Sequence, residues 1–229
     1  MESAIFYSFS IIIIALITFT IHQYLPPEKK NKSFLFPIVL IAAQIIIAVL
    51  GENEFYIDFN MPPRFAYAGI LPMFLILSRF VFSKIAKLLI EKVPTHFPVL
   101  FQSFRIVVEL LIYWAFLLGF APKEATMLGY NYEFYFGVLT IIIGVLVWKK
   151  KVAPRFIIAW NILGLAMLAI IIVIFFTSAF AYDTVWEYDH PIIDNHMFKP
   201  PYMAIATLYM PLAVWMHIFS IKQQISRGK

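Results

Sequence analysis

The sequence predicts an all-α, polytopic membrane protein built as one bundle of seven transmembrane helices. First, 62% of the 229 residues are apolar, against about 45–50% in ordinary soluble domains. Second, only 14% are charged, against about 25% usually. Third, apolar stretches recur at lengths near the ~20 residues that a helix needs to cross a bilayer. A disordered chain is excluded because it requires low hydrophobicity and high charge. A soluble domain is disfavoured because so small a fraction of polar residues cannot cover its surface.

The individual spans follow from this length criterion. The first has no positively charged leading region and no small-residue cleavage site, which favours a retained helix over a signal peptide. The third can continue past Ser83 as an interfacial turn with charged and apolar faces. Pro72 and Pro211 lie inside the third and seventh spans and are predicted to kink them. The seven predicted spans are residues 4–25, 34–51, 66–86, 98–120, 132–148, 156–180 and 201–221.

The connections between these spans are too short to fold separately. The longest are residues 52–65, 181–200 and 87–97, and none reaches the size of a soluble domain. Residues 1–229 are therefore expected to form a single transmembrane helical bundle domain.

The distribution of basic residues predicts the orientation. Of the 18 Lys and Arg residues, 14 fall at one set of alternate span ends and 3 at the other, with Arg105 inside the fourth span. By the positive-inside rule, the N-terminus is outside and the C-terminus is cytoplasmic. We expect a multi-pass protein of the bacterial inner (plasma) membrane. The basic residues are scattered over short turns beside lipid, so membrane lipids are the expected partners and nucleic acid is not; no protein partner is indicated.

Polar residues inside the spans are the main functional signal. Gln102, Arg105 and Glu109 are spaced to share one face of the fourth span, and Arg105 and Glu109 are close enough for a charge-assisted hydrogen bond. Other spans carry polar residues at similar depths. We expect these groups to converge on a ligand-binding site made of Gln44, Arg79, Gln102, Arg105, Glu109, Asn161 and His217.

The charge of this predicted site suggests a ligand. Two guanidinium groups and one carboxylate leave an excess of +1, which suits an anionic or carbonyl-bearing molecule. Ionisable residues within a span are usually functional, so the leading hypothesis is binding or translocation of a small anionic or lipid-like molecule. The alternative is a structural network that holds the helices in register, as in a structural or assembly subunit of a membrane complex.

An acidic outer loop offers a second hypothesis, a membrane-embedded enzyme. Its His and carboxylate side chains could bind a divalent metal, although their spacing matches no closed motif, and a solvated acidic loop is the alternative. The candidate ligands are Asp189, His190, Asp194 and His196.

No cofactor is predicted. The chain has no cysteine, which excludes thiolate sites, and it contains no nucleotide-binding, hydrolase or zinc-protease motif. The layout resembles that of an opsin, but no lysine lies between Met203 and Ile221 to form a retinal Schiff base. A binding or transport role is therefore favoured over an enzymatic one.

One segment resembles a known family. Gln102, Arg105 and Glu109 are followed by Pro122, Met127, Gly129, Asn131, Glu133 and Gly137, and then by Trp160, Asn161 and Gly164. Over residues 95–180 this pattern resembles a family of bacterial integral membrane proteins of about this length with no established activity. That family has Met-Thr-Phe before the glycine and Asp at position 133, whereas Leu128 follows Met127 here. The resemblance implies that Arg105, Glu109, Asn131 and Glu133 belong to one arrangement of residues that this chain shares with the family.

The residues of this segment also have a local interpretation. Gly129 and Asn131 suit a tight turn, and Glu133 lies in the first turn of the fifth span, where the positive end of a helix favours an acid. The alternative is that Asn131 and Glu133 lie at the mouth of a ligand pocket.

Overall fold

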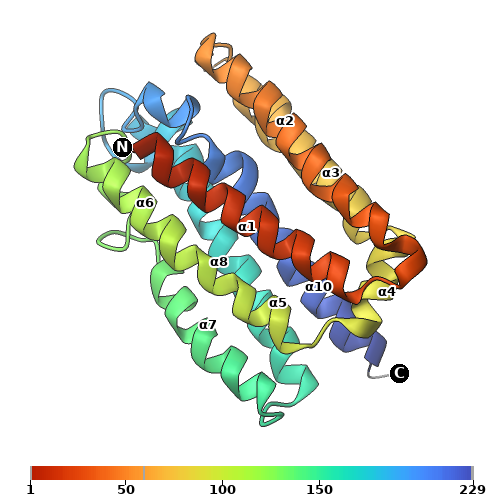
Figure 1. Ribbon diagram of the computed structural model, residues 1–229. Helices are drawn as coiled ribbons and strands as arrows, with labels where there is room; N and C mark the ends of the chain where they lie inside the picture. The colour runs from red at the N-terminus through yellow and green to blue at the C-terminus, as the bar shows by residue number, and fades with distance from the viewer. Residues whose placement is uncertain (1, 59, 228–229) are drawn as a thin grey trace.

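The protein is a bundle of long helices. The computed structural model describes residues 2–58 and 60–227, and those residues contain no β-strand. Figure 1 shows the helices running along one axis, with the start of α1 and the end of α10 at opposite ends of the bundle. In chain order the elements are α1 (Glu2–Tyr24), η1 (Pro27–Phe34), α2 (Leu35–Glu52), η2 (Phe65–Ile70), α3 (Leu71–Val81), α4 (Lys84–Lys92), α5 (His96–Phe101), η3 (Gln102–Phe104), α6 (Arg105–Leu117), η4 (Lys123–Ala125), α7 (Glu133–Trp148), α8 (Pro154–Phe180), α9 (Tyr182–Val185), η5 (Asn195–Phe198), η6 (Ile205–Tyr209) and α10 (Met210–Arg227).

The apolar helices confirm the all-α class. Within the described residues, five continuous helical segments are long and apolar enough to cross a membrane, and a sixth is counted if the bent pair η2–α3 and α4 forms one crossing. The axis of that pair bends by 65°. α7, with 16 residues, is a shorter apolar helix. The five segments are Glu2–Tyr24, Pro27–Glu52, His96–Leu117, Pro154–Phe180 and Ile205–Arg227.

The turn predicted after Ser83 is the separate helix α4. Ser83 caps it, because its Oγ accepts a hydrogen bond from Ala86 N at 3.1 Å, as N-cap serines do. Ala86, Leu89 and Ile90 are buried, while the charged side chains of the helix are exposed. α4 is therefore amphipathic, as its sequence predicts.

The two intraspan prolines follow the two π-helical stretches, η2 and η6. A proline has no N–H for the carbonyl four residues earlier, which leaves Ala68 O before Pro72 and Thr207 O before Pro211. Tyr56 Oη donates to Ala68 O at 3.5 Å, and Gln44 Nε2 donates to Thr207 O at 3.2 Å. Side chains from other segments thus bind a backbone carbonyl one turn before each proline.

Glycines bring α7 close to its neighbours. A Cβ atom at Gly137 would lie 2.9 Å from Ile106 Cγ1, and one at Gly144 would overlap Leu100. Small residues allow membrane helices to approach closely in this way. As a result the first turn of α7 lies against the start of α6, which positions the site described next.

Candidate functional site

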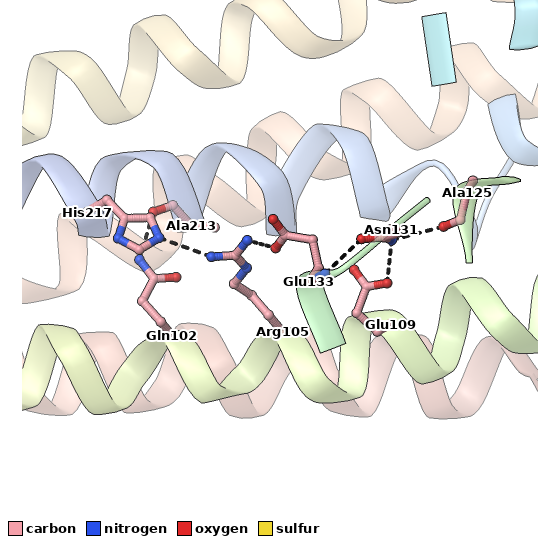
Figure 2. A network of polar contacts seen from close by, with 8 residues as sticks. All are labelled: Gln102, Arg105, Glu109, Ala125, Asn131, Glu133, Ala213 and His217. Atoms are coloured by element: carbon pink, nitrogen blue, oxygen red, sulfur yellow. Dashed lines mark hydrogen bonds and ion pairs between the residues drawn. The ribbon is translucent and has the colours of Figure 1, made fainter. Parts of the chain in front are cut away.

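An ion pair between α6 and α7 lies at the centre of a buried polar network (Figure 2). Arg105 begins α6 and Glu133 begins α7, and each is 2% exposed. The Arg105 guanidinium forms the ion pair with the Glu133 carboxylate. The same guanidinium lies 4.7 Å from the centre of the Phe136 ring, one turn further along α7, in a cation–π contact.

His217 connects Arg105 to α8. Asn161 Nδ2 donates to Ile157 O at 2.7 Å and to Ser220 Oγ at 3.0 Å, so its Oδ1 is the atom that accepts. His217 Nδ1 lies 2.8 Å from this oxygen and therefore donates. Nε2 of the neutral ring then accepts from Arg105 Nη1 at 3.1 Å. The ring is thus fixed in one tautomer.

A second branch joins Glu109 to the turn before α7. Asn131 Nδ2 donates to Glu109 Oε2 and to Ala125 O, and Asn131 Oδ1 accepts from Glu133 N at 3.0 Å. Asn131 therefore closes the turn, as its residue type predicts, and also binds the α6 carboxylate. Gln102 adds a contact to α10, where its Nε2 donates to Ala213 O at 2.9 Å.

Most of the polar residues predicted to converge do so. Gln102, Arg105, Glu109, Asn161 and His217 are all buried in this network. Asn131 and Glu133, placed by sequence at the mouth of a pocket, are also buried in it. The partner of Arg105 differs from the expectation, because the ion pair forms with Glu133 across two helices and not with Glu109 on the same helix.

Two predicted members lie elsewhere. Arg79 is exposed in the last turn of α3 and has no hydrogen bond or ion pair to any residue that the structure describes. The predicted third span extends to residue 86, whereas α3 ends at Val81, so Arg79 lies near a helix end where its long side chain can reach polar surroundings. Gln44 is half-buried and binds Thr207, away from Arg105.

These placements reverse the predicted charge of the site. The network contains one guanidinium and two carboxylates, where the sequence suggested two guanidiniums and one carboxylate. The argument for an anionic ligand, which rested on an excess of +1, therefore does not hold. Sequence reasoning placed Glu133 at the pocket but did not identify it as the ion-pair partner of Arg105. The signal was Gly137, because a glycine one turn after Glu133 permits the close approach of α7 to α6.

A cavity of about 380 Å³ opens beside the network. Its wall comes from η2, α3, η3, α6, the start of α7, α8, η5, η6 and the start of α10, and most of the lining is apolar or aromatic. The charged side chains among the described lining residues are Arg105, Glu109 and Glu133. Both π-helical stretches, η2 and η6, contribute to the wall, and π-helical turns are frequent at functional sites. The cavity thus combines apolar walls with a localised charged group, as small-molecule sites commonly do.

The outer-loop residues do not form the predicted metal site. Asp189 Oδ1 lies 2.5 Å from His190 Nδ1, and Asp194 Oδ1 lies 2.5 Å from His196 Nδ1. Each is a local pair of near neighbours in sequence, and the His196 ring stacks on Phe120. Among the described residues, no group of three or more His, Cys, Asp or Glu side chains could hold a metal ion. Each histidine contacts its own neighbouring carboxylate, and the two pairs do not gather into one group of ligands.

Comparisons with protein families, curated proteins and solved structures gave no match for this chain. The functional argument therefore rests on the geometry of the cavity and its polar network.

Proposed function

We propose that this chain crosses a bacterial inner membrane seven times, with its N-terminus outside and its C-terminus in the cytoplasm. The proposal adds the bent pair η2–α3–α4 and the short helix α7 to the five segments that meet the length criterion. Two features support an odd number of crossings: the described chain begins and ends at opposite ends of the bundle (Figure 1), and basic residues concentrate at alternate span ends.

Within this topology we propose that the protein binds a lipid-like molecule in the cavity beside Arg105. The observation that carries the proposal is an apolar cavity of about 380 Å³ whose only charged lining side chains in the described chain are Arg105, Glu109 and Glu133. Ionisable residues inside a membrane bundle are costly and usually functional. An apolar body would fill the cavity while a polar head would contact the charged group.

The location of the cavity supports loading from the bilayer. Ala66 on η2 and Ile172 and Phe176 on α8 line the cavity and are exposed. They mark an opening between two apolar helices. On the η5 side the cavity is covered by buried Ile193 and Met197, so the exposed side faces the region that lipid would occupy.

Native mass spectrometry of the gently purified protein, with extraction of co-migrating lipids, tests this function. Ala206 on η6 lines the cavity, and Ala206→Phe adds bulk there. Ala169→Phe makes the same change at an exposed position of α8 that does not line the cavity. We expect a bound lipid-like molecule in the wild type and in Ala169→Phe, and its loss in Ala206→Phe. Equal occupancy in all three proteins would contradict the proposal.

A structural role for the network is the second candidate. The bonds of His217 to Arg105 and Asn161 tie α6, α8 and α10 together, and polar groups hold membrane helices in register. A folded wild-type protein that neither carries nor takes up any lipid-like molecule would favour this role over ligand binding.

A further inference from the structure

We infer that the ligand of this cavity carries an uncharged hydroxyl group at its polar end, as a long-chain or isoprenoid alcohol does. This inference rests on the proposed function, because it assumes that the cavity holds a ligand. It identifies the head group by what Arg105 and Glu133 leave unsatisfied.

Both partners of the central ion pair have buried polar atoms without a hydrogen bond. Arg105 Nε and Glu133 Oε1 are both buried and have no hydrogen-bond partner within the described part of the chain. Both residues line the cavity. Arg105 Nε is a donor and Glu133 Oε1 is an acceptor. Leaving such groups buried and unpaired is costly, so a ligand that satisfies both is favoured.

A hydroxyl group meets both requirements at one atom. Its oxygen can accept from Arg105 Nε while its hydrogen is donated to Glu133 Oε1. A carboxylate or phosphate only accepts, so it leaves the Glu133 oxygen unpaired. It also brings a further negative charge beside Glu109 and Glu133. An ammonium only donates, so it leaves Arg105 Nε unpaired and places a second cation beside the guanidinium.

The remaining wall indicates an apolar, unbranched or isoprenoid body. The cavity volume of about 380 Å³ lies toward the lower end of the roughly 300–1,000 Å³ typical of small-ligand pockets. That volume suits one chain better than the two chains of a phospholipid. Aromatic side chains such as Phe65, Phe104 and Phe175 contribute much of the lining, and aromatic rings bury a large apolar area.

Four probes that share one chain and differ in the head group test the inference. Farnesol, its methyl ether, farnesylamine and farnesoic acid are titrated one at a time against the full chain in nanodiscs of fixed lipid composition. Binding is read as the occupied fraction by native mass spectrometry. We expect farnesol to bind most tightly. The methyl ether should bind about tenfold more weakly, because it cannot donate to Glu133 and leaves that acceptor unpaired. An acid, amine or ether that binds as tightly as the alcohol would overturn the inference.

Glu133→Gln provides the matched variant. The amide oxygen of Gln can still accept from Arg105, but the negative charge is removed, so the site becomes more favourable for an anion. We expect the preference for farnesol over farnesoic acid to fall by about tenfold or more in this variant. An unchanged preference would overturn the assignment of the head group to this pair.

The outcomes separate this inference from the proposed function. If all four probes bind equally and Ala206→Phe removes them all, the cavity binds ligands but the head-group inference is wrong. If no probe binds the wild type and no lipid co-purifies with it, the proposed function itself fails.

Discussion

At the scale of single residues, Arg105 is held by several groups whose contributions depend on one another. Glu133 neutralises its charge, His217 accepts one of its N–H groups and Phe136 covers its face. Removing one member of a buried ion pair leaves the other charge uncompensated, which commonly costs about 3–5 kcal/mol. Replacing both members with apolar side chains of similar size is often nearly neutral.

This dependence gives a prediction for the ion pair. Arg105→Met should lower the free energy of unfolding by about 3–5 kcal/mol because it leaves Glu133 buried without its cation. Arg105→Met combined with Glu133→Met should be substantially more stable than Arg105→Met alone. Reversible unfolding in mixed micelles measures both variants. A double variant that is no more stable than Arg105→Met would show that the two side chains do not stabilise each other.

Residue spacing along one helix could be predicted from sequence, whereas partners across helices could not. The shared face of Gln102, Arg105 and Glu109 follows from helical periodicity. The pairing of Arg105 with Glu133 depends on how closely α7 approaches α6, which the glycine at 137 allows. Arg79 was misplaced because the hydropathy of residues 66–86 does not reveal that α3 ends at Val81.

At the scale of elements, η6 and the proline that follows it depend on a side chain from α2. Pro211 cannot donate to Thr207 O, and Gln44 donates to this carbonyl instead. Gln44 was expected in the ligand site, but its position indicates a role in joining α2 to η6. This is the contact of a polar residue that holds two membrane helices together.

Gln44→Leu tests this role. Leucine has a similar size but no donor, so we expect the free energy of unfolding to fall by about 1 kcal/mol. Ligand occupancy of the cavity should be unaffected, because Gln44 does not line it. Thermal unfolding in detergent reads the first effect and native mass spectrometry the second. A loss of ligand without a loss of stability would show that Gln44 contributes to ligand binding and not to the contact between α2 and η6.

The boundaries of the elements were predicted less well than their existence. The expected third span divides into η2–α3 and α4, with a 65° bend between them. Ser83 and the amphipathic pattern after it marked this break, since a serine cap favours a new helix start. The π-helical form of η2 and η6 has no comparable signal, because the two prolines predict only a local disruption.

At the scale of the whole molecule, an ion pair joins two connections at one end of the bundle. Lys199 Nζ lies 2.7 Å from Glu54 Oε1 and links the segment after α2 to the segment before η6. The hydrogen bond from Lys199, and then its charge, lower the pKa of Glu54 from its ordinary value. A lowered pKa in the folded state means that the stabilisation is present above the unfolded pKa, about 4.3 for Glu. It is lost as the pH falls through the folded value.

Lys199→Met tests this pH dependence. At neutral pH this variant should unfold at a slightly lower temperature than the wild type, since exposed ion pairs contribute little. The difference between the two should shrink as the pH is lowered through the acid range in which Glu54 becomes protonated. Thermal unfolding of both proteins in the same detergent, from neutral pH downward, measures it. A difference that is independent of pH would show that Lys199 acts by packing and not through Glu54.

The orientation of the bundle yields a direct test, because the chain contains no cysteine. Single cysteines can therefore be introduced at exposed positions without background labelling. Lys123 precedes α7 and Lys149 follows it, and both are exposed. If α7 crosses the membrane despite its 16 residues, these two positions lie on opposite sides. Asn195, between α8 and η6, should lie on the same side as Lys123.

We expect a membrane-impermeant maleimide added to intact spheroplasts to label Lys123→Cys and Asn195→Cys but not Lys149→Cys. After permeabilisation all three should react, which controls for the reactivity of each site. Equal labelling of Lys123→Cys and Lys149→Cys in intact spheroplasts would place both ends of α7 on one side and reduce the number of crossings. Labelling of Lys149→Cys alone would show that the protein has the orientation opposite to the proposed one. The cavity beside Arg105 would then open to the same lipid, but its η5 side would face the cytoplasm.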